Sequence, residues 1–443
     1  MFAFRPIDGK SNEPLSGPVW NPFVRFAFRF GFVYLGLYCL FSQVIVSVLL
    51  APKTIPGPGL GTHWPFFQAT SWAAVHIFGI KDALVYTGNS RDTTFFWAQA
   101  FVLLVAATMI TVLWSVVDRR HKNYVSLHKW FRVFMRFALA AQMFYFGMTK
   151  IIPTQFPAPS LLTLVAPVGN LSLQSMLWTS IGASAGYQIF TGLVEVAGGL
   201  LLLVPRTTTI GALICLASMF HVFILNMTYD LGVKLLSFTL VLMSLFLLMP
   251  DFRRLGNFFL FNRSAGVSTE PTLFDNARAN RIAVAVQIVF GVYLLAMYAD
   301  IGRTYWYLDG AGSPKSALYG IWNVEEMAID GAVRPPELND YDRRWRRVIF
   351  ESPQWIFFQR TDDSFVRYGV TIDSNKLALT KGRSQTWQSS FTFQRPSPDR
   401  LLLDGQMDGH TINLKLQLLE FDTFRLLNSP FRWARPPDPD TER

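Results

Sequence analysis

Charged residues and cysteines are scarce in this chain of 443 residues. Asp, Glu, Lys and Arg make up 16% of the sequence, whereas soluble globular domains usually contain about 25%. The two cysteines, Cys39 and Cys215, both lie inside apolar runs. The scarcity of cysteine excludes a disulfide framework and a Cys-x-x-Cys metal or redox motif, and the scarcity of charge argues against a wholly soluble enzyme.

Motifs that bind cofactors are also missing. The chain contains no Gly-x-Gly-x-x-Gly fingerprint, phosphate-binding loop, His-Glu-x-x-His pair or serine elbow. No cofactor is therefore evident, no metal site is predicted, and the sequence leaves open whether the protein is an enzyme. The first 20 residues are too polar for a cleaved signal peptide, so the first spanning helix is expected to target the chain.

Apolar runs are abundant. A spanning helix needs about 20 mainly apolar residues, and seven stretches meet or approach this length. We expect about seven transmembrane helices at Phe30–Leu50, Phe95–Val117, Val133–Ile152, Ala185–Val204, Thr208–Met227, Val233–Met249 and Ile282–Ala299.

The charges orient these spans. The part from Arg303 onward has 19 basic and 19 acidic residues, so the net charge of +10 lies entirely before it. The basic residues flank apolar runs and form no patch with interleaved aromatics, so the predicted partner is the lipid bilayer and no nucleic acid is expected. Basic loops follow the second, fourth and sixth spans, whereas residues 152–185 carry no charge. The positive-inside rule then predicts a multi-pass protein of the bacterial inner membrane, with a cytoplasmic N-terminus and a periplasmic C-terminal domain.

A long loop at residues 51–94 separates the first two spans. Its aromatic stretch from Trp64 to Ile80 fits either an interfacial helix on the outer leaflet or a folded extracellular loop.

The spacing of apolar residues along the chain changes after Arg303. Short runs rich in aromatic and β-branched residues alternate with turn residues, which predicts an antiparallel β-barrel or sandwich. The expected strands are 321–329, 345–351, 355–360, 365–372, 376–380, 387–394, 400–404, 410–418 and 424–427, with turns at Asp404-Gly405 and Asp408-Gly409. The Gly320-Ile321-Trp322 sequence resembles the first strand of lipocalin-like barrels, in which the Trp closes one end beneath an arginine; Arg425 or Arg432 fits that role.

Six segments follow from these patterns. They are a disordered cytoplasmic N-terminus (1–23), the first two spans with their long loop (24–131), a four-helix membrane core (132–250), a cytoplasmic loop with the last span (251–302), a periplasmic β-rich domain (303–434) and a disordered tail (435–443).

Ionisable residues inside a span are expensive, so they are candidates for function. Depth along the helices places several polar residues in the outer half of the bilayer, where Lys150 can reach Glu195. The candidate ligand-binding residues are Tyr145, Lys150, Glu195, His221, Asn226, Tyr229, Asp230 and Lys234. Gly192 and Gly199 share the face of Glu195 and allow another helix to approach closely. The alternative is that a Lys150–Glu195 pair only holds the helices in register.

The membrane core resembles the DoxX family of bacterial membrane proteins. The resemblance covers about Arg132 to Pro250 and rests on three motifs: Arg136 with Gly147-Met-Thr-Lys150, Glu195 with the small residues after it, and the segment from Asn226 to Lys234. Some members are similar to the membrane subunit of a thiosulfate:quinone oxidoreductase. The resemblance therefore implies a four-helix fold, a redox-linked role and contact with a quinone.

Two hypotheses follow. In the first, the protein is redox-linked and binds a quinone or similar lipophile between the helices, alone or with another membrane subunit. In the second, it is a non-catalytic anchor that presents its β domain to a ligand or protein partner.

Overall fold

The computed structural model describes residues 19–49, 59–80, 92–266, 272–337, 340, 344–382, 384–428 and 433–434. Disorder was predicted for residues 1–23 and for the tail 435–443; residues 1–18 and the tail lie outside this part. The prediction was wrong at its C-terminal end, because α1 begins at Pro22 and the Trp20 N–H donates to the Lys122 carbonyl at 3.0 Å. The chain forms two compact units, and both are assembled from separate segments. The helical unit contains Met1–Gln155 and Gly186–Tyr305, and the barrel unit contains Phe156–Ala185 and Trp306–Arg443.

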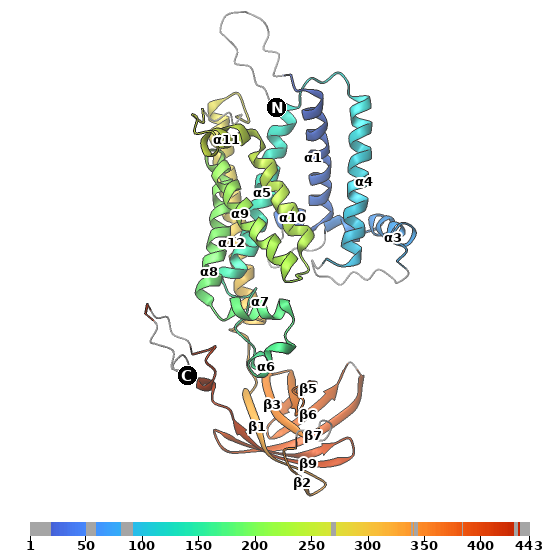
Figure 1. Cartoon of the computed structure of the whole chain (residues 1–443), viewed down its shortest axis with the longest axis vertical. Coiled ribbons are helices and arrows are strands. Elements are labelled where there is room, and N and C mark those ends of the chain that lie inside the picture. The colour runs from blue at the N-terminus through green and yellow to red at the C-terminus, as the bar shows by residue number, and fades with distance from the viewer. Residues whose placement is uncertain are drawn as a thin grey trace, which may run out of the picture. The chain divides into compact units, whose positions relative to one another are not determined.

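Six helices of the described part are long and apolar enough to cross a membrane. They contain α1 (Pro22–Phe41), α4 (Thr94–Val117), α8 (Ala185–Leu203), α9 (Thr208–Thr228), α10 (Lys234–Leu248) and α12 (Ala277–Leu308). The chain is therefore a multi-pass membrane protein, as the apolar runs predicted. A seventh helix, α5 (Val125–Ile151), is long enough but carries four basic residues. Figure 1 shows α5 among the other helices of this unit.

The first expected span is broken. Helix α1 ends at Phe41, Ser42 is extended, and α2 (Gln43–Leu49) begins after it. The prediction of one continuous helix to Leu50 was therefore wrong. Polar residues explain the break, because Gln43 on α2 donates to Gln142 on α5 (2.9 Å) and Gln142 donates to Ser47 (2.5 Å). The change of chain direction at Ser42 lets these polar side chains form hydrogen bonds with one another inside the apolar bundle.

Short helical elements connect the long helices. In the first long loop, η1 (Gly59–Thr62) precedes α3 (Phe66–His76), which packs its small residues Thr70, Ala73 and Ala74 toward the bundle. The expected helical stretch is therefore present, and its position in the outer leaflet stays a prediction. After α10, η4 (Met249–Asp251) leads into α11 (Phe252–Phe259). The turn between α8 and α9 is η3 (Pro205–Thr207).

The second unit contains a closed antiparallel barrel. Its strands are β1 (Gly320–Ile329), β3 (Trp345–Ser352), β4 (Trp355–Arg360), β5 (Phe365–Asp373), β6 (Lys376–Lys381), β7 (Ser384–Ser397), β8 (Arg400–Met407) and β9 (His410–Leu418). Each pairs with the next, β1 pairs with β9, and the short β2 (Ala332–Arg334) pairs antiparallel with the end of β1. Inward-facing apolar residues of all eight strands fill the interior. The prediction of an antiparallel β domain is confirmed, and the barrel replaces the sandwich (Figure 1).

Three details of the β prediction need correction. Residues 424–427 form turns after η5 (Phe421–Thr423) and not a strand. Gly405 lies inside β8 opposite Ile412, where a Cβ would meet the Ser390 carbonyl oxygen at 2.2 Å. Asp408 and Gly409 do form the expected turn, with φ of 52° and 84°. The arginine beside the buried Trp322 is Arg395, whose guanidinium carbon lies 5.6 Å from the ring centroid; Arg432 lies outside the described residues.

The uncharged segment between α5 and α8 belongs to the barrel unit. It forms α6 (Leu161–Val165), η2 (Val168–Asn170) and α7 (Leu173–Gly182). Leu161 packs with Ile321 and Ile349 of the barrel, and its N–H donates to Glu351 (2.9 Å). The expected membrane core at 132–250 is thus interrupted here, because this apolar loop contributes to the core of the other unit.

Candidate functional site: a buried lysine–glutamate pair

The strongest candidate among the predicted residues is the pair of Lys150 on α5 and Glu195 on α8. The ammonium nitrogen of Lys150 donates to both carboxylate oxygens, at 2.9 Å and 2.7 Å. Lys150 is 6% exposed and Glu195 is 1% exposed. Removing two charges from solvent costs several kcal/mol per ion, and the direct contact offsets part of that cost. The structure therefore brings together the two residues that depth and spacing had paired.

Glycines allow the pair to form. A Cβ at Gly192 would lie 2.6 Å from the carbonyl oxygen of Gly147, and one at Gly147 would lie 2.9 Å from that of Gly192. The two backbones are therefore in direct contact, one turn of α5 before Lys150 and one turn of α8 before Glu195. Gly199 in turn faces the ring of Phe144. The close approach predicted for Gly192 and Gly199 is present, and Gly147 is the partner that the sequence alone did not identify.

A second basic residue of α5 holds the other end of α8. The guanidinium of Arg136 donates to the carbonyl oxygens of Leu202 and Leu203, at 2.7 Å each. These carbonyls belong to the last turn of α8, which has no helical partners for them and carries the negative end of the helix dipole. Arg136 and Lys150 therefore fix α8 to α5 at two levels.

His221 and Tyr145 are not part of this pair. His221 lies on the exposed side of α9, whose buried face contains Cys215, Met219 and Asn226. Five residues separate Tyr145 from Lys150, so the two point in different directions; the Tyr145 ring lies 5.7 Å from that of Tyr298 on α12. His221 therefore points away from the buried face of α9, and its participation in a ligand site with Lys150 and Glu195 stays a prediction.

The remaining candidates form a separate cluster at the α9–α10 turn. Asn226 is buried and donates to Ser237 at 2.9 Å, and Lys234 forms an ion pair with Asp230 at 2.8 Å. This ion pair lowers the pKa of the Asp230 carboxyl. Tyr229 is the half-buried C-cap of α9. Among the described residues, no hydrogen bond or ion pair connects this turn to Glu195, so these residues stabilise the connection between two helices.

Sequence reasoning missed a neutral polar network on another face of α5. It joins Gln43 and Ser47 of α2 to Gln142 of α5 and Tyr298 of α12, whose hydroxyl donates to the Ser47 carbonyl at 2.8 Å. All four side chains are buried. The break at Ser42 is what brings Gln43 and Ser47 of α2 to Gln142, and no local sequence pattern indicated that break.

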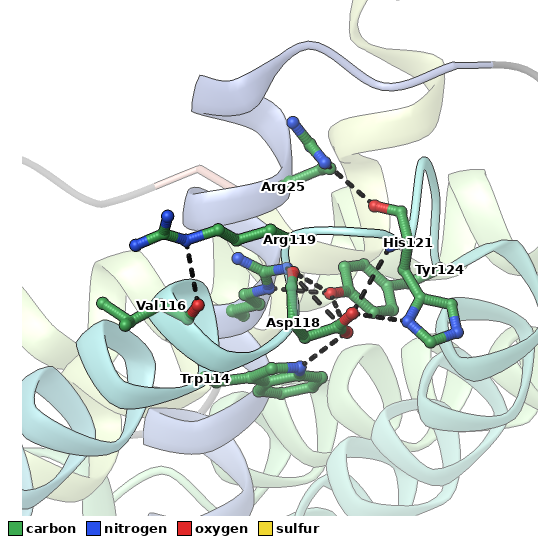
Figure 2. A network of polar contacts seen from close by, with 8 residues as sticks. Arg25, Trp114, Val116, Asp118, Arg119, His121 and Tyr124 are labelled. Atoms are coloured by element: carbon green, nitrogen blue, oxygen red, sulfur yellow. Dashed lines mark hydrogen bonds and ion pairs between the residues drawn. The ribbon is translucent and has the colours of Figure 1, made fainter.

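A second network joins the α4–α5 connection to α1 (Figure 2). It lies at the N-terminal end of α5, whereas Lys150 lies at the C-terminal end. Asp118 accepts from Tyr124 (2.7 Å), Trp114 (3.2 Å) and the His121 ring (2.5 Å). Arg29 of α1 donates to the Tyr124 hydroxyl (2.9 Å) and to the Asp118 carbonyl (2.7 Å). The hydrogen bond from Tyr124 contributes most to lowering the pKa of the Asp118 carboxyl, and those from His121 and Trp114 lower it further. The network holds α1, α4 and the start of α5 together at this end.

Together these features define a multi-pass helical membrane protein with a buried ion pair and an eight-stranded barrel unit. Over 124 residues the chain is 32% identical to the uncharacterised protein YwoB of Bacillus subtilis (strain 168), a match that covers 28% of this chain and 79% of that protein. The chain belongs to the family of YwoB. No family model and no solved structure matches it.

Proposed function

We propose that the helical unit binds a quinone or a similar carbonyl-bearing lipophile at the Lys150–Glu195 pair, in a redox-linked role. The observation that carries this proposal is an ion pair almost without solvent contact inside an apolar bundle, since such residues usually mark a pathway or a ligand site. The resemblance to the DoxX family, which we propose as the wider relationship, points to the same chemistry.

The donors of the pair suit such a ligand. A lysine ammonium has three N–H donors, and in the described part of the chain two of its hydrogen bonds go to Glu195. One N–H is then available to a quinone carbonyl, while the carboxylate oxygens keep lone pairs for a quinol hydroxyl. The neighbouring charge offsets the cost of keeping each group ionised in the absence of a ligand.

The proposal is tested on protein purified in mild detergent. Lipophiles extracted with solvent are identified by mass spectrometry for the wild type, for the double variant Lys150→Met/Glu195→Gln and for the control Asp230→Asn, which removes an exposed carboxylate of the same unit. We expect a quinone in the wild type and the control and its loss from the double variant. Equal retention in all three proteins, or no quinone in the wild type and no thermal stabilisation by added quinone, would contradict the proposal.

We further propose an orientation, with the N-terminus in the cytoplasm, the barrel in the periplasm and the inner membrane of a bacterium as the location. Two facts support it. The segment 156–185 and the barrel belong to one unit, so the loop after α5 and the chain after α12 emerge on the same side. The loops with most arginines, after α4 and α10, lie at the other end of the helices.

The anchor hypothesis is the second candidate, and one observation favours it. The barrel is connected to the helices by three chain crossings, because α6 and α7 enter the barrel unit after α5 and leave it before α8, and α12 leads into β1. A photoreactive residue at Asn375 or Lys415, both exposed, should then crosslink to a periplasmic component in intact cells. Crosslinks to lipid alone from both positions would contradict this role.

A further inference from the structure

Helix α11 exposes an unusual run of large apolar side chains. Phe252, Phe258, Phe259, Leu260 and Phe261 are between 62% and 79% exposed. Helical spacing places Phe252, Phe258 and Phe259 on one side of this helix, with Leu255, and Arg253, Arg254 and Asn257 on the other. The helix is therefore amphipathic, and three of the four residues on its apolar side are exposed, so we call this the open side. Water is a poor solvent for such a surface, which usually marks a contact with a membrane or a partner.

Arginines border the open side. Arg253 and Arg263 are exposed, and the Arg263 guanidinium carbon lies 6.0 Å from the Phe261 ring centroid. Residues 252–266 contain no Asp or Glu. The nearest acid, Asp251, is buried and already accepts from Arg254 and Thr209, at 2.5 Å each. The segment is therefore a short basic amphipathic helix, and no ion pair joins Arg253 or Arg263 to another residue in the described part of the chain.

The same contacts fix the place of this helix. Thr209 lies in the first turn of α9, and α11 follows α10 after one turn of η4. Figure 1 shows α11 at the end of the bundle where α9 begins and α10 ends. The exposed Arg278 and Arg281 lie at the start of α12. The open side thus lies at the end of spanning helices whose own exposed apolar residues face lipid in a membrane protein.

We infer that α11 and the residues to Arg263 lie in the membrane interface and bind anionic phospholipid, with the Phe and Leu side chains among the acyl chains and Arg253 and Arg263 at the phosphates. Apolar burial and attraction between cations and an anionic leaflet act together in such helices. This inference does not rest on the quinone proposal, because α11 and Lys150 lie at opposite ends of α5.

Scanning fluorimetry of the purified full-length protein tests the headgroup contact. Phosphatidylglycerol should raise the midpoint of thermal unfolding, phosphatidylcholine and inorganic phosphate should not, and Arg253→Gln/Arg263→Gln should lose most of the rise. The control Arg303→Gln removes an exposed arginine from the other end of the bundle and should keep it. An unchanged rise in the double variant, an equal loss in the control, or a full effect of inorganic phosphate would overturn the inference.

A second measurement tests insertion and does not use a change in thermal stability as its readout. A nitroxide on Leu260→Cys, in nanodiscs that contain phosphatidylglycerol, should collide more often with oxygen than with a water-soluble nickel chelate. The native cysteines are buried and should stay unlabelled. A label at Asn375 on the barrel should show the reverse preference. Free access of the nickel chelate to position 260 would show that α11 faces water or a protein surface, which contradicts the inference.

Discussion

At the residue scale, single side chains of α5 determine how the helical unit closes. Lys150 contacts Glu195 and Arg136 caps the end of α8, so these two buried cations of α5 both have partners on α8. Each has a partner of opposite charge or partial charge, which is the condition under which buried cations are tolerated. The charged residues of α5 thus hold α8 against it. They also make α5 less apolar than the other spans.

The Lys150–Glu195 pair should behave as one thermodynamic unit. Lys150→Met or Glu195→Gln alone leaves the other charge buried and unpaired. Each single variant should therefore lower the free energy of unfolding by about 3–5 kcal/mol. The double variant should be more stable than the less stable single variant, because no unpaired charge remains. A double-mutant cycle by reversible unfolding in detergent measures the coupling, and strictly additive losses would show that the two side chains act independently.

A side chain at Gly192 should destabilise the packing of α5 against α8. Gly192→Ala places a methyl group 2.6 Å from the Gly147 carbonyl oxygen, so α5 and α8 must separate, at a cost of about 1–3 kcal/mol. Gly186→Ala on the same helix is the control, because nothing lies within 4 Å of its Cβ and alanine is the better helix former. Thermal unfolding should show a lower midpoint for Gly192→Ala only. Equal midpoints would exclude the tight backbone contact.

At the scale of elements, the connection between α4 and α5 is held by side chains and not by regular structure. Asp118 accepts from Trp114 of α4 and from Tyr124, and Arg29 brings α1 to the same place (Figure 2). The Arg29 guanidinium also lies 5.1 Å from the Tyr124 ring centroid, a favourable cation–π distance. The Asp118 carboxylate thus links α4 to Tyr124 at the start of α5, and it lies 3.9 Å from the Arg29 guanidinium of α1. This end of the bundle is therefore sensitive to the protonation of Asp118.

Acid should loosen this connection. The folded-state pKa of Asp118 is lowered, whereas an unfolded Asp has a pKa of about 3.9. Its stabilising contribution is therefore fully present above that value and is lost as the pH falls toward the folded pKa. Asp118→Asn should be less stable than wild type at pH 7 and should lose less stability on acidification.

The measurement is the unfolding midpoint across this pH range. The control is Asp275→Asn, which removes an exposed carboxylate and should follow the wild type at every pH. Parallel curves for wild type and Asp118→Asn would contradict the role of Asp118.

At the scale of the whole molecule, the division into two units constrains how the chain crosses the membrane. The barrel unit takes its first 30 residues from the connection between α5 and α8. Gln359 on β4 donates to the Val165 carbonyl at 3.3 Å, and Glu351 accepts from Leu161 at 2.9 Å. Burial raises the pKa of Glu351. The barrel cannot complete this surface without the loop, so both must reach the same compartment.

Cysteine labelling in intact cells tests the proposed orientation. Asn170→Cys in the loop and Asn375→Cys on the barrel should react with a membrane-impermeant maleimide, and Lys122→Cys between α4 and α5 should react only after lysis. All three positions are exposed, and the buried native cysteines provide a silent background. Opposite labelling of positions 170 and 375 would contradict a shared compartment, and labelling of position 122 alone would invert the topology.

The sequence by itself determined the helical and β-rich parts and most spans and strands. It also determined that Lys150 and Glu195 lie at similar depths along their helices. It could do so because apolar length and a period of two residues are local properties of a chain. The pairing of Lys150 with Glu195 was predicted for the same reason, since helical rise fixes depth.

Only the tertiary structure decided which polar residues meet. It turned His221 outward, broke the first span at Ser42 to bring Gln43 and Ser47 to Gln142, and assigned the uncharged loop 156–185 to the barrel. Rotation of one helix about its axis depends on its packing against the others, and a loop joins whichever core buries its apolar residues best. Neither is encoded in local periodicity, because both depend on contacts between segments far apart in the chain.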